Sequence, residues 1–191
     1  MLPNSRLLIA LLTAVTLGST IARADFSAPV TAQQQMVVSA HALASRIGND
    51  ILDQGGNAID AAVASAYALA VVHPCCGNLG GGGFMTIHLA EQDRDLSINF
   101  REKAPLAAGR DMYLGTDGEV RHDWLMASYL SVGVPGTVMG LDHALSRYGS
   151  MDRETVMAPA IALARDGFEL SRDDTNLLVY GTRKFRRYPN S

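Results

Sequence analysis

Arg101 and Glu102 stand in the segment NFREKAP, residues 99–105, where a predicted strand ends and Pro105 opens a loop. A guanidinium at the end of a strand is held rigidly, and it can bind a planar carboxylate through two parallel hydrogen bonds, which a lysine cannot do. Arg101 is therefore a candidate carboxylate-binding residue. The residues alone leave open a purely structural ion pair between Arg101 and a nearby carboxylate or a helix C-terminus.

The segment HPCC, residues 73–76, offers three potential metal ligands. A structural zinc site needs a second pair of ligands at a suitable spacing, and none follows in the sequence. A disulfide between neighbouring cysteines is strained and closes no useful loop, so we interpret both as small packing residues. A nucleophilic cysteine paired with His41, His73 or His88 stays open. The sequence thus predicts no metal ion and no cofactor.

Four consecutive glycines, Gly80–Gly83, follow the two cysteines in the stretch CCGNLGGGGFM. They lie after a predicted helix and before a predicted strand. A phosphate-binding glycine loop needs the reverse order, because the N-terminus of the following helix supplies the amides that hold the anion. The order of elements therefore excludes a nucleotide-binding loop.

The elements that must position these residues are predicted from hydrophobic periodicity and from helix-capping signals. Gly55 is expected to end one helix, and Asn57 is expected to cap the next. Of the two later helices, the first is expected to run from an N-cap at Thr137 to a stop at Gly149. The second is expected to run from an N-cap at Asp152 to a stop at Gly167. Pro159 is expected to kink its helix, and the last helix is expected to end in a basic, turn-like tail. The predicted strands span residues 35–41, 84–90 and 96–100, and the predicted helices span residues 41–54, 58–72, 137–149 and 152–167, with another from about 171.

This order of elements contains no run of βαβ units, no repeat and no low-complexity linker. It predicts one α+β domain in which helices pack on an antiparallel sheet. The 191 residues are 48% hydrophobic and 18% charged, which excludes a disordered or collagen-like chain. The net charge of -3 favours neither nucleic acid nor an anionic membrane as a partner, and the basic residues 183–187 are interpreted as a solvated helix end.

The N-terminus has the pattern of a secretory signal peptide. Arg6 precedes an apolar run at residues 7–17, and Ala22-Arg23-Ala24 forms an A-x-A cleavage site before Asp25. The apolar run is too short to cross a bilayer, which takes about 20 residues. We therefore expect residues 1–24 to be removed, and the mature protein to be periplasmic or secreted without a stable membrane anchor.

Five blocks, in this order and spacing, resemble the N-terminal part of the large subunit of the γ-glutamyltranspeptidases, also called glutathione hydrolases. The resemblance runs from about Met36 to about Asp174. It implies the N-terminal-nucleophile hydrolase fold, an αββα sandwich, of which residues 25–191 would form an incomplete, N-terminal portion. The blocks are GGNAIDAAVASAYALAVVHP, GNLGGGGFM, NFREKAP, SVGVPGTVMGL and MAPAIALARDGF.

The resemblance implies an enzyme made as a precursor that cleaves itself into a large and a small subunit. Its nucleophile is the threonine that starts the small subunit, and its own α-amino group serves as base; this threonine is expected beyond Ser191. The enzyme transfers the γ-glutamyl group of glutathione and other γ-glutamyl compounds to that threonine, then to water or to an amino-acid or peptide acceptor. The present chain alone is expected to be inactive. The threonines that do not match the family's cleavage motif are Thr20, Thr31, Thr86, Thr116, Thr137, Thr155, Thr175 and Thr182.

Arg101 matches the arginine that, in this family, holds the α-carboxylate of the γ-glutamyl group. By the same resemblance Gly80–Gly83 are turn and packing positions that need no ligand. Cys75 and Cys76 depart from the family, in which many relatives carry Gln-Ala or similar residues, and this departure puts only local packing in doubt.

Three other functions stay open from the sequence. A cephalosporin acylase or a poly-γ-glutamate depolymerase would share the fold, because the contacts that separate these enzymes lie largely downstream. A non-catalytic product of a truncated gene, with a binding or chaperone-like role, would be a stable monomer. The enzyme hypothesis instead predicts a fragment that aggregates through unpaired strand edges.

Overall fold

The structure, a computed structural model, describes residues 28–187. The predicted signal peptide at residues 1–24 lies outside the described residues. The chain divides into two units, residues 1–33 and residues 34–191. The described part of the first unit contains no helix or strand.

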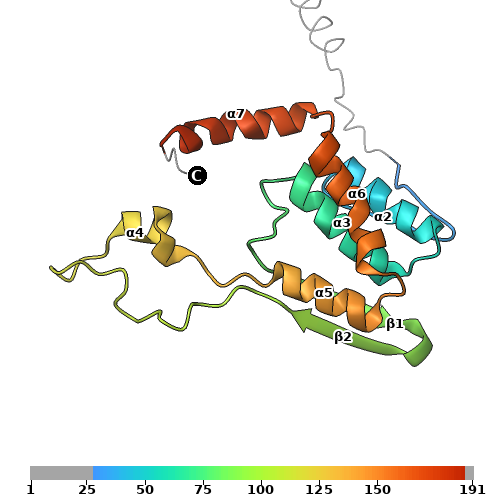
Figure 1. Cartoon of the computed structure of the whole chain (residues 1–191), viewed down its shortest axis with the longest axis horizontal. Helices are drawn as coiled ribbons and strands as arrows, with labels where there is room; N and C mark the ends of the chain where they lie inside the picture. The colour runs from blue at the N-terminus through green and yellow to red at the C-terminus, as the bar shows by residue number, and fades with distance from the viewer. Residues whose placement is uncertain (1–27, 188–191) are drawn as a thin grey trace, which may run out of the picture. The chain divides into compact units, whose positions relative to one another are not determined.

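Helix α3 (Ala58–Val72) is the centre of the second unit (Figure 1). Nine of its 15 residues are buried, because small and apolar residues cover nearly its whole circumference. It packs against α2 (Ala42–Asp53), α6 (Arg153–Asp166) and α5 (Thr137–Tyr148). The apolar sequence of α3 thus makes it the inner helix of a small bundle.

A capping box begins α3. The side-chain oxygen of Asn57 accepts hydrogen bonds from the backbone N–H groups of Ile59 and Asp60, and Asp60 accepts one in return from the Asn57 backbone at 2.7 Å. Asp60 is fully buried and also accepts from the backbone N–H groups of Ser150 and Met151. One carboxylate therefore joins the start of α3 to the connection between α5 and α6.

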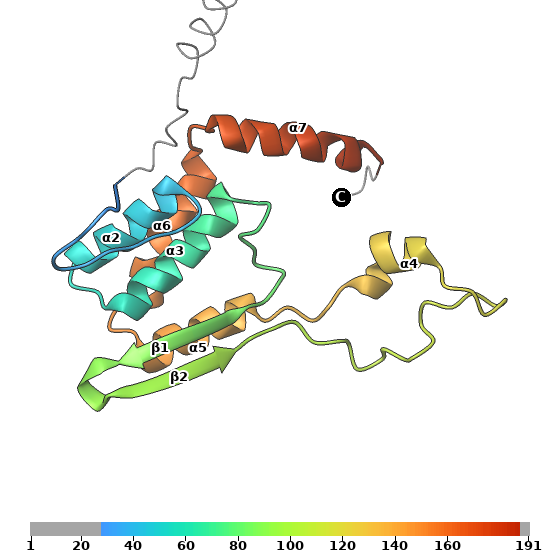
Figure 2. The ribbon, with the colours of Figure 1, turned by 180° about the vertical axis from the view of Figure 1, so that it is seen from behind.

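The strands β1 (Phe84–Leu89) and β2 (Arg94–Asn99) form an antiparallel hairpin (Figure 2). Ile87 lies opposite Leu96 and Met85 opposite Ile98, so these four side chains share one face, and that face packs into the main core. The connection is a short 3-10 helix, Ala90–Gln92, closed by Asp93 in the left-handed conformation. Among residues 28–187 this hairpin is the only sheet, so the expected two-sheet sandwich is represented by one pair of strands.

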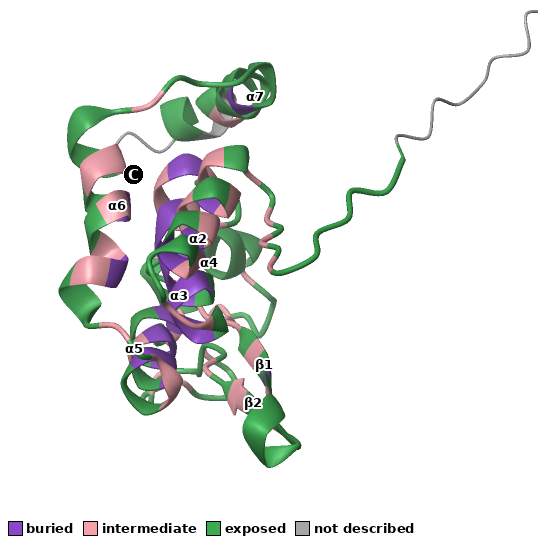
Figure 3. Ribbon diagram, turned by 90° about the vertical axis from the view of Figure 1, so that its right-hand side faces the viewer, coloured by how far each residue is buried: buried purple, intermediate pink, exposed green. Residues whose placement is uncertain are grey.

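Two further helices lie outside this core. Helix α7 (Arg172–Arg187) starts next to α2, because Asp174 accepts a hydrogen bond from the Ser171 backbone at 2.8 Å and lies 3.4 Å from His41. Helix α4 (His122–Ala127) and the 3-10 helix Tyr129–Ser131 fall in a segment, residues 101–136, that contains no buried residue (Figure 3).

Most predicted elements of the core are confirmed. The helices at 41–54, 58–72 and 152–167 and the hairpin agree with α2, α3, α6, β1 and β2 to within two residues at each end. Gly55 ends its helix with a φ of 91°, and Asp152 caps α6 through the Thr155 backbone. Helix α6 continues past Pro159 to Asp166.

Three expectations are wrong, and one helix was not expected. Residues 35–41 do not form the predicted strand, because they have no strand partner within the described part of the chain. The N-cap of α5 is Gly136, since the hydroxyl of Thr137 donates instead to the Asn78 side chain at 2.7 Å. Helix α7 continues through the basic residues predicted to be a turn, because acidic residues in its first turn and cations in its last turn both favour the helix dipole. Helix α4 was not predicted.

No helix within residues 28–187 combines the length and the apolar character needed to cross a membrane.

Candidate functional site

Arg101 lies two residues beyond the end of β2, as the sequence predicts. Its side chain is 68% exposed, and its Nε lies 3.3 Å from a carboxylate oxygen of Glu102. Its backbone N–H donates to the side chain of Asn99, the last residue of the strand, at 3.0 Å. The guanidinium is thus carried by a backbone tied to the hairpin, while most of its surface stays open to a ligand.

The backbone around Arg101 is held on both sides. Phe100 exchanges backbone hydrogen bonds with Gly83, at 3.0 and 3.4 Å, which extends the hairpin by one pair. Lys103 pairs with Val134 in an isolated antiparallel bridge, with hydrogen bonds of 2.8 and 3.3 Å. These contacts connect residues 100–103 both to the glycine run and to the segment that leads into α5.

Two glycines are required for this arrangement. A Cβ on Gly82 would come within 2.5 Å of the Phe100 carbonyl oxygen and 2.7 Å of the Glu102 backbone nitrogen. A Cβ on Gly140 would collide with the ring of Phe100, which lies against α5 at that point. A Cβ on Gly80, by contrast, would meet nothing within 4 Å. The prediction that the glycine run serves close backbone packing therefore holds at Gly82 and not at Gly80.

The glycine run is also pinned to the start of α5. The backbone N–H groups of Gly136 and Thr137 both donate to the carbonyl oxygen of Gly81, at 2.8 and 3.0 Å. The side-chain oxygen of Asn78 accepts from the Gly81 backbone and from the Thr137 hydroxyl. The N–H groups of Gly136 and Thr137, at the start of α5, therefore have acceptors within the protein.

A pocket of about 470 Å³ lies between the end of β2 and α5. Two cationic residues, Arg101 and Lys103, contribute to its lining, and none of the described residues that line it is acidic. The remaining lining residues are Ile98, Asn99, Phe100, Val134, Pro135, Gly136, Met139, Gly140 and His143. A concave, largely apolar site with two cations suits a small anionic ligand.

Sequence reasoning identified only Arg101 among these residues. Lys103 stands in the same block, NFREKAP, and the spacing of two from Arg101 was the signal that could have identified it. His143 is 42 positions from Arg101 along the chain, and only the packing of α5 against the end of β2 brings it to the pocket. No sequence pattern indicated His143.

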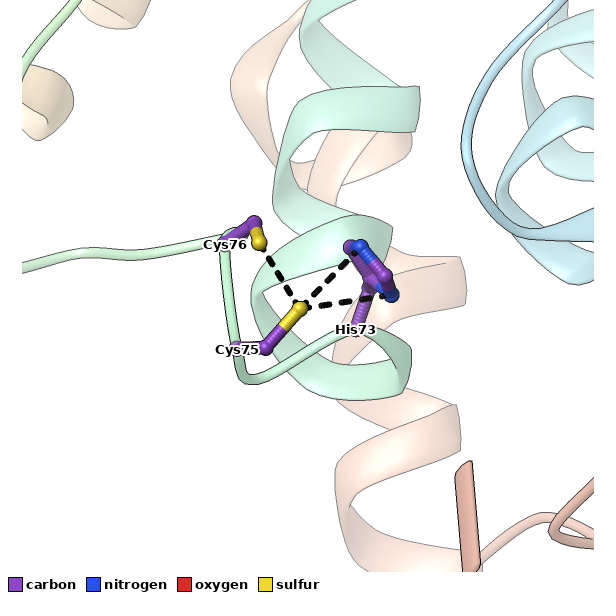
Figure 4. Close-up of side chains that lie close together, drawn as sticks. All are labelled: His73, Cys75 and Cys76. Atoms are coloured by element: carbon purple, nitrogen blue, oxygen red, sulfur yellow. Dashed lines mark hydrogen bonds between the residues drawn. The ribbon is translucent and has the colours of Figure 1, made fainter. Parts of the chain in front are cut away.

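The segment HPCC lies at the C-terminal end of α3, away from the lining of this pocket. The Sγ of Cys75 is 3.3 Å from the Nε2 of His73 and 2.7 Å from the Sγ of Cys76 (Figure 4). Both cysteines are free and exposed. The three side chains that sequence analysis considered as metal ligands are therefore together in space.

The structure decides which histidine could assist a nucleophilic cysteine. His41 lies beside Asp174 and His88 lies beside Asp95. Of the three candidate histidines, His73 is the one whose hydrogen-bonding contact with a thiol is seen within residues 28–187. The hydrogen bond with Cys76, followed by partial desolvation, raises the pKa of the Cys75 thiol. A raised pKa reduces the thiolate fraction, so this environment does not activate Cys75 as a nucleophile.

The sequence model of the gamma-glutamyltranspeptidase family matches residues 44–191. The glutathione hydrolase proenzyme of Pseudomonas sp. (strain A14) is 52% identical over 160 residues, which is 84% of this chain and 28% of that relative. The chain therefore spans less than a third of that relative's length.

Solved structures agree with the sequence match. The Helicobacter pylori gamma-glutamyltranspeptidase superposes with a TM-score of 0.80 at 44% identity, over 84% of this chain and 46% of that one. The Bacillus anthracis transpeptidase enzyme CapD superposes with a TM-score of 0.63 at 29% identity, over 80% of this chain and 46% of that one. The fold is thus part of the N-terminal-nucleophile hydrolase fold, and the chain belongs to the gamma-glutamyltranspeptidase family.

Proposed function

We propose that this chain supplies the carboxylate-binding part of a γ-glutamyltransferase and glutathione hydrolase. The observation that carries the proposal is Arg101, an exposed guanidinium at the edge of a pocket whose lining contains two cations and no acid. A γ-glutamyl donor has a free α-carboxylate, which is the group that a guanidinium binds best. The relative from Pseudomonas sp., a glutathione hydrolase proenzyme, supports the same substrate class.

In this proposal Arg101 positions the donor and takes no part in bond breaking. Two parallel hydrogen bonds to the α-carboxylate fix both the place and the orientation of the substrate, so that its γ-carbonyl carbon is presented to the nucleophile. The contact between Arg101 and Glu102 restricts the guanidinium before the substrate arrives, which lowers the entropy lost on binding.

In this proposal the chemical step is carried out by the threonine that starts the small subunit. The hydroxyl oxygen of the small-subunit threonine attacks the γ-carbonyl carbon, and its proton passes to the threonine α-amino group. The amide C–N bond then breaks as the α-amino group gives that proton to the leaving nitrogen, and the amine departs. Water or an acceptor amine then attacks the resulting ester and restores the threonine. In this proposal the small subunit of the same precursor completes the site, and the present chain alone is inactive.

We also propose that residues 1–24 are a cleaved signal peptide and that the enzyme acts in the periplasm or outside the cell. N-terminal sequencing of the purified protein tests this, with Asp25 expected as the first residue.

The substitution Arg101→Lys tests the binding role in the complete protein that the gene encodes. Lysine keeps the charge and loses the bidentate geometry, so we expect KM for γ-glutamyl donors to rise by about 10- to 100-fold, as expected for loss of a charged hydrogen bond. Arg110→Lys is the matched control, because Arg110 is exposed and its nearest carboxylate is 3.9 Å away. An unchanged KM in Arg101→Lys would remove Arg101 from the site.

The substrate class is tested separately with the unmodified protein. We expect release of glutamate from glutathione, and transfer of the γ-glutamyl group to an added dipeptide. Cleavage of poly-γ-glutamate or of a cephalosporin side chain without activity on glutathione would assign the chain to another branch of the fold.

A further inference from the structure

The turn that follows α3 brings three metal-binding side chains to one point. The donor atoms of His73, Cys75 and Cys76 all lie within 4.8 Å of one another (Figure 4). Among the described residues, this is the only group of three or more histidine, cysteine or acidic side chains with that property. The convergence lies apart from the pocket that contains Arg101, so an inference from it does not depend on the proposed function.

The backbone explains why the donors converge. His73 is the C-cap of α3, and its carbonyl oxygen accepts hydrogen bonds from the N–H groups of Cys76 and Gly77, at 3.1 and 2.8 Å. This tight turn holds the start and the end of the HPCC segment together. The side chains of both cysteines are exposed, so they can rotate to meet an ion.

We propose that His73, Cys75 and Cys76 bind a single thiophilic d¹⁰ cation, Zn²⁺ or Cu⁺, through two thiolates and one imidazole. Thiolate ligands select Zn²⁺ and Cu⁺ over harder cations. Two cysteines and one histidine are also a known donor set for zinc sites that keep a fourth position open to water. This proposal departs from the sequence-based prediction of no metal ion, which rested on the absence of a second ligand pair; an open site with three ligands needs no such pair.

The distances are compatible with such an ion. With a Zn–S bond of about 2.3 Å in tetrahedral geometry, the two sulfur atoms would lie about 3.8 Å apart. The thiols lie 2.7 Å apart, so one of them must move outward by roughly 1 Å. The separation of 3.3 Å between Cys75 Sγ and His73 Nε2 needs a smaller change.

The surroundings favour a cation over an anion. Cys75 lines a groove between the end of α3 and α7, and the carboxylate of Asp174 lines the same groove. No lysine or arginine is among the described residues that line it. On binding Zn²⁺ the two thiols release their protons, and the resulting thiolates neutralise the ion.

Metal titration of the complete protein tests the proposal. The protein is reduced, freed of reductant and titrated with Zn²⁺ in competition with a chromophoric chelator, and the titration is repeated with Cu⁺ under nitrogen. We expect the wild type to bind one ion more than the Cys75→Ser/Cys76→Ser variant, for at least one of the two metals. X-ray absorption of the loaded wild type should show two sulfur ligands and one imidazole nitrogen.

The variant His73→Gln separates a three-ligand site from a simple thiol pair. Loss of even an outer partner of a metal ligand costs about 10- to 100-fold in affinity, so loss of the imidazole should cost at least that. His88→Gln is the matched control, because His88 is exposed on β1 and pairs with Asp95. We expect it to bind the ion as the wild type does.

Three results would overturn the proposal. Equal stoichiometry in the wild type and the double serine variant would show that the cysteines bind neither ion. One extra ion per two chains would show a bridge between copies instead of a site in one chain. Unchanged affinity in His73→Gln, or no imidazole signal in the absorption spectrum, would exclude His73 as a ligand.

Discussion

The α3 helix and the segment of residues 101–136 both contain many apolar side chains, yet they differ completely in burial. Nine of the 15 residues of α3 are buried, whereas residues 101–136 include none. Helix α3 begins with a capping box, but the N-cap of α4, Arg121, makes no side-chain capping bond. Trp124 and Leu125 on α4 remain 38% and 41% exposed.

This difference shows that the burial of an apolar side chain depends on the elements packed around it and not on the amino-acid composition of its own segment. Around α3, three other helices present apolar faces at matching positions, and the hydrogen bonds of Asp60 lock their connections together. Residues 101–136 have anchors mainly at their two ends, where Lys103 pairs with Val134 and where Gly136 donates to Gly81. Arg101 lies at the first of these anchors, where the rigid core meets the exposed segment.

The largest effect is expected for a substitution at Gly82, which packs against the backbone next to Arg101. In Gly82→Val, the new side chain would collide with the backbone of Phe100 and Glu102, which no rotamer change can relieve. We expect loss of soluble, folded protein, measured by soluble yield and circular dichroism. Gly80→Val is the matched control and should fold, since a Cβ there meets nothing within 4 Å. A folded Gly82→Val protein with selectively altered substrate choice would contradict the packing role.

The second largest effect is expected for a substitution in the core around α3, at Asp60. Asp60→Ala leaves the backbone N–H groups of Ser150 and Met151 without their acceptor. We expect a loss of about 3 kcal/mol in the free energy of unfolding, measured by urea titration. The control Asp123→Ala, on the exposed helix α4, should change it by less than about 0.5 kcal/mol. Equal effects of the two substitutions would remove the distinction between the regions.

A third pair of substitutions compares the cost of shortening an apolar side chain in the core with the cost of shortening one in residues 101–136. Val156 on α6 is fully buried, so Val156→Ala should cost about 2 kcal/mol in the free energy of unfolding. Leu125→Ala on α4 removes more carbon atoms but from an exposed side chain, and it should cost less than about 0.5 kcal/mol. A larger cost at Leu125 would mean that α4 has a packing partner in the complete protein.

The smallest expected effect concerns the attachment of α7. Hydrogen bonds from Ser171, with a smaller contribution from His41, hold the pKa of Asp174 below its usual range. A lowered pKa in the folded state means that this stabilisation is present above the pKa of the unfolded chain. It is lost as the pH falls through the lower, folded value.

We therefore expect the protection factors of the α7 amides, that is their exchange relative to an unfolded chain at the same pH, to fall in acid, below about pH 4. Asp174→Asn should remove most of this pH dependence, and Asp173→Asn, one residue earlier and exposed, should keep it. The same acid response in both variants would assign it to other carboxylates.

Some parts of the fold and site could be predicted because local interactions determine them. The bounds of α3 follow from Asn57, whose side chain caps the helix, and from Gly55, whose positive φ ends the helix before it. Arg101 could be placed at a strand end because the alternation of β2 stops at Asn99. Helix caps, helix stops and strand alternation each depend on residues that are close together in the chain, so they can be recognised in the sequence.

Other parts depended on contacts between distant residues. Residues 35–41 carry a strand-like pattern, but no strand among the described residues pairs with them. The hydroxyl of Thr137 turns away from its own helix because Asn78, 59 positions earlier, accepts from it. His143 reaches the pocket only through the packing of α5 on β2. The sequence by itself determined the core helices, the hairpin, the family and the candidate role of Arg101. Only the tertiary structure decided which side chains surround Arg101. It also decided that the side chains of His73, Cys75 and Cys76 converge. Both depend on the conformation of the turns, which sets the direction of the chain that follows each of them.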